Sequence, residues 1–247
     1  MQTQGDAGTA HAGGEHWERL APGVVRRRLP GWDATVGAIA GADGVLVVDT
    51  GSSLHEGVEI RREVQELFGL PVTHIALTHP HFDHVLGTAA FSGVQVYAAV
   101  GTEELLARER EELRHDAVRH GMEPDTAAEA VDLLVLPHHA VSGEVTVDLG
   151  GGRRVLLANI GPGHTAHDLA ALVAGEREVV FCGDVVEESG EPQAGPDALP
   201  HAWPAALDRL LSLGGEDALY VPGHGAVVDA AFVRAQRDAL AERFGVS

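Results

Sequence analysis

The densest group of metal-binding side chains in this sequence lies between residues 74 and 88. A short apolar run, Ile75–Leu77, is followed by four side chains that can bind a metal ion: His79, His81, Asp83 and His84. Imidazole nitrogens and carboxylate oxygens are the ligands that zinc-like divalent ions prefer. Without a metal, burial of these groups together would leave polar atoms unpaired. The pattern therefore predicts a metal centre.

The spacing of these residues favours two ions over one. His79 and His81 are two residues apart, so they point to the same side of an extended backbone. Asp83 and His84 follow where a turn leads into a helix, and their side chains can point elsewhere. Two ions about 3.5–4 Å apart, as in two-metal hydrolases, divide four close ligands more readily than one tetrahedral ion.

Three downstream segments complete a pattern that resembles the metallo-β-lactamase superfamily of metallohydrolases. They read GPGHT at 161–165, FCGD at 181–184 and VPGHG at 221–225. The segments supply His164, Asp184 and His224, and the resemblance covers about residues 24 to 244. It implies an α/β (α+β) fold built as a four-layer αβ/βα sandwich, with the metals at one edge between the two sheets. The periodicity of the sequence alone supports only an α/β or α+β domain.

The resemblance also implies a role for each ligand. It assigns one metal to His79, His81 and His164, the other to Asp83, His84 and His224, and makes Asp184 the bridge between them. A water or hydroxide would be a second bridge, and Asp83 would orient it as a catalytic residue. Asp49, which ends the apolar run 45–48, would hydrogen-bond behind a metal ligand. The expected cofactors are two zinc ions, with iron or manganese as alternatives.

The function that we expect is dinuclear zinc-dependent hydrolysis of an ester, thioester, lactone or amide of a small molecule. β-Lactamase branches with Arg or Cys after the motif Asp do not fit, since His84 stands there and the chain has no Lys for a substrate carboxylate. The pattern is nearest to stand-alone hydrolases similar to glyoxalase II, but the chain ends soon after His224, where glyoxalase II has a glutathione-binding region. The subfamily stays unassigned. Two alternatives remain open: a mononuclear iron oxidoreductase similar to persulfide dioxygenases, and a non-catalytic metal-dependent binding protein.

Composition limits the partners of the chain. The formal net charge is −20, from 17 basic and 37 acidic residues, and such a surface repels nucleic-acid phosphates. No apolar run reaches 18 residues, so no membrane partner is expected. Residues 1–15 lack the basic and apolar regions of a signal peptide. We therefore expect a cytoplasmic protein with a small-molecule substrate. The oligomeric state does not follow from the sequence.

The remaining segments predict a short tail and one domain. Residues 1–15 are polar and predict a disordered tail, and residues 16–247 predict a single domain. Charged helical patterns between 102 and 139 interrupt the alternation of strands and helices, and we interpret them as a helical cap over the metals. Strands are expected at 24–29, 35–40, 45–48, 94–98, 141–149, 153–159, 169–173, 179–182 and 218–221, and helices at 52–68, 203–213 and 229–243.

Overall fold

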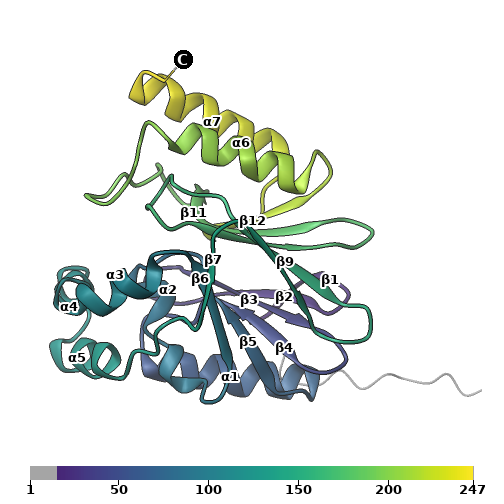
Figure 1. Ribbon diagram of the computed structural model, residues 1–247, viewed down its shortest axis with the longest axis vertical. Helices are drawn as coiled ribbons and strands as arrows, with labels where there is room; N and C mark the ends of the chain where they lie inside the picture. Colours follow the sequence, from purple (N-terminus) through teal and green to yellow (C-terminus); the bar gives the residue numbers. More distant parts are fainter. Residues whose placement is uncertain (1–15, 247) are drawn as a thin grey trace, which may run out of the picture.

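The computed structural model describes residues 16–246, so the predicted tail of residues 1–15 lies outside the described residues. Two β-sheets stack face to face, and helices cover the outer face of each sheet (Figure 1). The arrangement confirms the expected mixed α/β fold with four layers.

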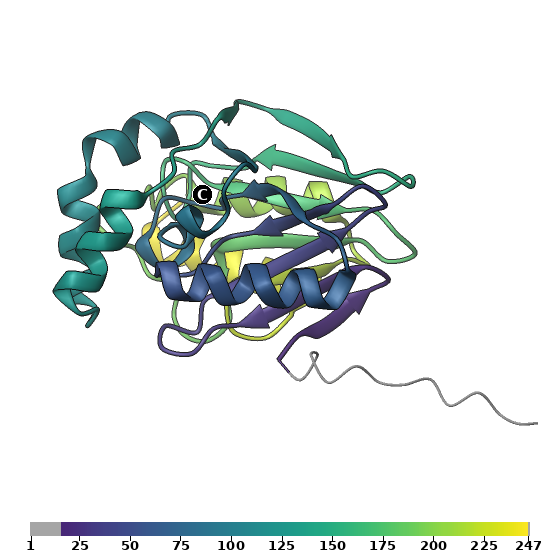
Figure 2. The same ribbon diagram turned by 90° about the horizontal axis from the view of Figure 1, so that it is seen from below.

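The first sheet has seven strands whose spatial order follows the sequence. Its strands are β1 (Glu18–Ala21), β2 (Val24–Arg28), β3 (Thr35–Ala40), β4 (Val45–Val48), β5 (Val72–Ala76), β6 (Gln95–Ala99) and β7 (His139–Val141). Strands β1 to β4 pair antiparallel, and β4 to β7 pair parallel. Helix α1 (Leu54–Phe68) joins β4 to β5 and lies across the outer face (Figure 2). The Ser53 side chain caps its start, which satisfies a free backbone N–H.

The second sheet has five strands in the order β12-β11-β10-β9-β8. They are β8 (Glu144–Asp148), β9 (Arg154–Asn159), β10 (Leu169–Val173), β11 (Val179–Glu187) and β12 (Leu219–His224). Only β11 and β12 pair parallel. Helices α6 (Trp203–Gly214) and α7 (Ala230–Phe244) pack on its outer face (Figure 1).

Alternating side chains divide the interior into three hydrophobic clusters. In β4, Val45 and Val47 face α1, whereas Leu46 and Val48 face the second sheet. In β11, Val179 and Phe181 face the first sheet, whereas Val180 and Cys182 face α6 and α7. Because successive side chains of a strand point to opposite faces, strands that are apolar throughout predict sheets buried on both sides.

Three features differ from the expected elements. Strand β1 was not predicted. The expected strand 141–149 is interrupted at Ser142 and Gly143, because the chain passes there from β7 in the first sheet to β8 in the second. Strand β11 continues beyond Cys182 to Glu187, with an irregular register at Gly183. A glycine followed by an acid therefore lies within the strand rather than after it.

The helices that interrupt the strand pattern gather at one end of the molecule (Figure 1). They are α3 (Thr102–Arg108), α4 (Arg110–Arg119) and α5 (Pro124–Leu133). The short helix α2 (Phe82–Val85) and a 3₁₀ turn, Thr88–Ala90, lie between β5 and β6. All three long helices fall within the predicted cap region, and α4 packs against α2. Their action as a cap stays a prediction.

Candidate metal centre

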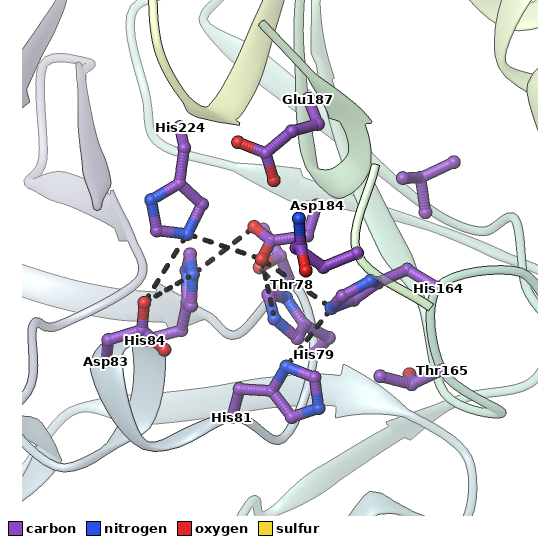
Figure 3. A network of polar contacts seen from close by, with 12 residues as sticks. Thr78, His79, His81, Asp83, His84, His164, Thr165, Asp184, Glu187 and His224 are labelled. Atoms are coloured by element: carbon purple, nitrogen blue, oxygen red, sulfur yellow. Dashed lines mark hydrogen bonds and ion pairs between the residues drawn. The ribbon is translucent and has the colours of Figure 1, made fainter. Parts of the chain in front are cut away.

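The seven predicted ligands converge at one edge of the two sheets. The segment after β5 carries His79 and His81, and α2 carries Asp83 and His84. The other three come from the second sheet and its loops: His164 from the β9–β10 loop, Asp184 from β11 and His224 from β12. Their side chains point toward one another (Figure 3). The structure therefore brings together every ligand that the sequence predicted.

The ligand atoms form two groups, each with members within 4.8 Å of one another. One is His79, His81, His164 and Asp184, and the other is Asp83, His84 and His224. Nε2 of His84 lies 3.3 Å from Oδ1 of Asp184, and Nε2 of His224 lies 3.4 Å from Oδ2 of Asp83. Such distances are longer than ordinary hydrogen bonds. Ligands about 2.0–2.1 Å from a tetrahedral zinc ion lie about 3.3–3.4 Å apart, so the spacing fits a shared cation.

Buried polar atoms without partners support the same conclusion. Among the described side chains, Nε2 of His79, Nε2 of His84, Nδ1 of His164 and Oδ1 of Asp184 are buried and lack a hydrogen-bond partner. Burial of an unpaired polar group costs roughly 1–3 kcal/mol in proteins. Three of these atoms, on His79, His84 and Asp184, lie in the cluster itself. Metal coordination would satisfy these three atoms, so the residues fit a metal ion.

Asp49 orients two of the histidines from behind. Its Oδ2 accepts hydrogen bonds from His84 Nδ1, at 2.9 Å, and from the Thr78 hydroxyl, at 2.7 Å. The Thr78 oxygen in turn lies 3.0 Å from Nδ1 of His79. Because one nitrogen of each ring is held by these partners, the other nitrogen is the one that faces the centre. Asp49 is buried and has φ of 59°. The sequence predicted a hydrogen bond from Asp49 behind a metal ligand without naming the partner, and in the structure that partner is His84.

Two further contacts fix the rings at the edge of the centre. Oδ2 of Asp197 lies 3.0 Å from Nε2 of His81, and the backbone carbonyl of Trp32 accepts from Nδ1 of His224 at 2.9 Å. The nitrogens left for the centre are therefore Nδ1 of His81 and Nε2 of His224. Sequence reasoning missed both partners, and it also missed the role of Thr78. Only Thr78 had a local signal, because it immediately precedes His79.

The residues just after His164 shape its loop rather than contact its ring. Both oxygens of Asp168 accept from the Thr165 N–H, and Oδ1 also accepts from its hydroxyl at 2.7 Å. Burial raises the pKa of Asp168 to about 7. The ring of His167 contacts the carbonyl oxygen of Val100 at 2.8 Å. Asp168 therefore stabilises the turn that presents His164.

The carboxylates and imidazoles shift one another's protonation. Burial lowers the pKa of His79 well below its ordinary value, and it lowers that of His164 to about 4, so both rings are neutral. Burial also opposes the charge on His224, but Asp184 and Asp83 outweigh it and raise its pKa to about 11. The pKa of Asp184 lies well below its ordinary range, because the surrounding histidines outweigh its burial. The carboxylates thus create a site that attracts positive charge.

A cavity of about 680 Å³ opens beside this centre. His81, Asp83, His164, Asp184 and His224 line one side of it. The other sides come from α3, α4, Trp32 and the segment 193–197. Clefts of about 300–1,000 Å³ accommodate small molecules, so the geometry provides room for a substrate in contact with the candidate ligands.

Comparisons with known proteins agree with this geometry. A family model described as the metallo-β-lactamase superfamily matches residues 29–224. A metallo-β-lactamase from Pontibacter korlensis has a similar structure, with a TM-score of 0.72 and 20% identity over 91% of this chain and 97% of that one. The metallo-β-lactamase FIM-1 from Pseudomonas aeruginosa, in its mono-zinc form, gives a TM-score of 0.69 with 20% identity over 94% and 96%.

A third similar structure, a metallo-β-lactamase from Hirschia baltica, has a TM-score of 0.67 and 18% identity over 91% of this chain and 96% of that one. At these identities the solved structures establish the fold, and the family model connects the chain to its relatives. The matched residues 29–224 include all seven residues of the cluster. The chain therefore belongs to the metallo-β-lactamase superfamily and has a fold typical of its metal-dependent hydrolases, with a His/Asp cluster suited to metal ions.

Proposed function

We propose that the protein is a dinuclear zinc-dependent hydrolase that acts on an ester, thioester, lactone or amide of a small molecule. The observation that carries this proposal is the pair of ligand groups at the base of one cavity. Atoms of the cluster are spaced as ligands of a tetrahedral ion would be, and several are buried without another partner.

The residues would hold the two ions as follows. His79, His81 and His164 would bind one, Asp83, His84 and His224 the other, and Asp184 would bind both. A pair of such ions lowers the pKa of a bound water to about 7 and polarises the bond to be cleaved. Nδ1–H of His84 and Nδ1–H of His224 are already held by acceptors, so these rings need no rearrangement to bind.

Asp83 is the residue that we propose to orient the attacking water. Its carboxylate is buried and lines the cavity, with Oδ2 3.4 Å from Nε2 of His224. A water at this point can donate a hydrogen bond to Asp83, which aims a lone pair of the water at a substrate carbonyl in the cavity. Asp83 therefore lies among the candidate metal ligands and also faces the cavity in which the substrate would bind.

The contact between cavity and centre supports an enzyme over a non-catalytic binding protein. Helices α3 and α4 form walls of the cavity and leave the candidate ligands open to it. The His81 side chain is 26% exposed. Catalytic zinc sites keep an open position, whereas structural sites are closed. We propose that these helices act as a cap that shapes the choice of a small-molecule substrate. Among the described residues no helix is long and apolar enough to span a bilayer.

Elemental analysis of protein purified without added metal, combined with an acyl-substrate panel, tests the proposal. We expect about two zinc ions per chain and turnover of at least one lactone, thioester, ester or amide. The variant Asp83→Asn should lose at least about 100-fold in kcat, because it weakens both a ligand and the acceptor for water. Fully zinc-loaded protein without turnover across the panel would contradict the proposal. One tightly bound iron with oxygen uptake on glutathione persulfide would favour the oxidoreductase instead.

A further inference from the structure

Helix α4 turns one face toward the cavity that contains the metal centre. Glu112, Leu113 and Asp116 line the cavity, as do Glu109 just before the helix and His120 just after it. Their separations of three and four residues place them on one side of the helix. The face is mainly carboxylate, with one buried leucine in its middle. The wall opposite the metal ligands is therefore both acidic and apolar.

The only arginine that lines this wall among the described residues is already paired with carboxylates of the wall. Among the described residues that line the cavity, Arg119 is the only arginine, and the sequence contains no lysine. Nη2 of Arg119 lies 2.9 Å from Glu112 and 2.9 Å from Asp116. One guanidinium thus faces two carboxylates, while Glu109 pairs with Arg108, which is outside the lining. The wall offers no free cation to a substrate carboxylate.

Aromatic rings line the same cavity as these carboxylates. The Phe82 ring lies 5.3 Å from Trp32, edge to face, and 5.5 Å from the stacked ring of His120. The Trp32 indole donates to the backbone oxygen of His120 at 3.2 Å, which ties the rings to the end of α4. Aromatic faces beside carboxylates attract organic cations, because the ring quadrupole and the negative charge act together.

The acidic wall shares its cavity with the metal centre, which contains a buried carboxylate oxygen without a hydrogen-bond partner. Asp184 lines the same cavity, is only 7% exposed, and has no partner for Oδ1. The volume of about 680 Å³ suits one small molecule that spans the wall and the centre. Recognition and reaction can therefore involve opposite ends of one substrate.

We infer that the substrate is an acyl compound that carries an amine or quaternary ammonium group. The cation lies against Glu109, Glu112 and the aromatic rings, while the acyl group lies at the metal centre. This inference rests on the hydrolase activity proposed above, and it specifies the class of substrate.

Three thioacetates of similar size but different charge test the inference. They are acetylthiocholine, its neutral isostere S-(3,3-dimethylbutyl) thioacetate, and the anionic 3-(acetylthio)propanesulfonate. An exposed charge pair is worth up to about fivefold in binding, so several carboxylates should give the cation about a tenfold higher kcat/KM than the neutral compound. The anion should be the poorest substrate. The preference should shrink at high salt, because exposed charges are screened.

Two double variants distinguish the effect of the acidic wall on substrate preference from the effect of the protein's overall charge. The double variant Glu109→Gln/Glu112→Gln should reduce the cation-to-neutral ratio of kcat/KM to about one. The matched control, Glu103→Gln/Glu111→Gln, removes the same charge from exposed positions of α3 and α4 outside the lining. The control should keep the preference.

Calorimetric binding of phenyltrimethylammonium to the zinc-loaded protein gives a readout that does not need turnover. Its Kd should rise at least fivefold in the Glu109→Gln/Glu112→Gln variant and not in the control. Equal kcat/KM for the three thioacetates, or preference for the anion, would overturn the inference and leave the hydrolase proposal standing. Cation binding that depends on Glu109 and Glu112 without hydrolysis of any thioacetate would support the cation site and count against the hydrolase. Equal Kd values in all proteins would overturn the cation site itself.

Discussion

Replacement of Asp49 by Asn provides the sharpest test of how the centre is held. The Asp49 carboxylate accepts from three donors: the Thr78 N–H at 2.8 Å, the Thr78 hydroxyl at 2.7 Å and His84 Nδ1 at 2.9 Å. An amide of the same size has one acceptor oxygen and a donor NH₂ group. At least one protein donor must therefore face the NH₂ group. Asn tolerates the positive φ of this position as Asp does, so backbone strain does not change.

The expected loss falls mainly on the ion held by His84. If the amide donates to Nδ1, His84 changes tautomer and Nε2 carries the proton, which prevents it from binding a metal. Loss of such a supporting contact typically costs 10–100-fold in metal affinity, or about 1.4–2.8 kcal/mol. Asp49 reaches His79 only through the Thr78 hydroxyl, and it has no contact with His81 or His164 among the described side chains. The other ion should therefore weaken less than the ion held by His84.

Competition with a coloured chelator measures the two zinc affinities separately. The control is Asp229→Asn, which keeps a good helix cap at an exposed position outside the cluster and the cavity lining and should change neither affinity. Circular dichroism should show the same fold in all three proteins. Equal weakening of both ions, or no weakening in folded Asp49→Asn protein, would refute the reasoning about His84.

Three further predictions address other parts of the centre. Gly223→Ala would place a Cβ 1.8 Å from Oδ1 of Asp184, so it should reduce zinc affinity at least about 100-fold, whereas Gly143→Ala, with nothing within 4 Å, should be neutral in the same chelator assay. Asp197→Ala should weaken zinc binding by up to about tenfold, less than Asp49→Asn, because its side chain is 44% exposed; an equal or larger loss would contradict this. Zinc binding should release protons, measured as acidification of a weakly buffered solution, because the pKa of His224 is raised to about 11 and the ring must lose its proton to bind. Zinc affinity should therefore rise with pH between 6 and 8, and pH-independent affinity without proton release would contradict the assignment of His224.

The ligands could be predicted from the sequence because they are concentrated at strand ends. His79, His81, Asp83 and His84 lie within six residues, and an apolar strand before them fixes where they begin. In glycine-containing segments, His164 follows a strand, His224 ends one, and Asp184 lies within β11 beside the irregular register at Gly183. Parallel strands bring their carboxyl ends to one edge of a sheet. Local patterns therefore predicted a site whose residues are far apart in the sequence.

The groups behind the ligands could not be predicted in the same way. Asp197 lies 116 residues from His81, in a segment without regular structure. Trp32 contributes a backbone carbonyl to His224, and a carbonyl is present whatever the residue type. The break between β7 and β8 was missed for a related reason, since the apolar pattern continues across it while the chain changes sheets. Contacts that depend on how two sheets meet leave no local signal.

The centre lies where the two sheets meet, so its residues join the two halves of the molecule. His79 and His84 belong to segments of the first sheet, while Asp184 and His224 belong to strands of the second. A hydrogen bond that orients a ligand also crosses from one sheet to the other, because the backbone carbonyl of Trp32, between β2 and β3, accepts from His224 on β12. Ions bound there would add coordination bonds between sheets that otherwise meet through apolar contacts such as Leu46 and Phe181. Because the unfolded chain has no preformed site for a metal, metal binding would contribute directly to the stability of this interface.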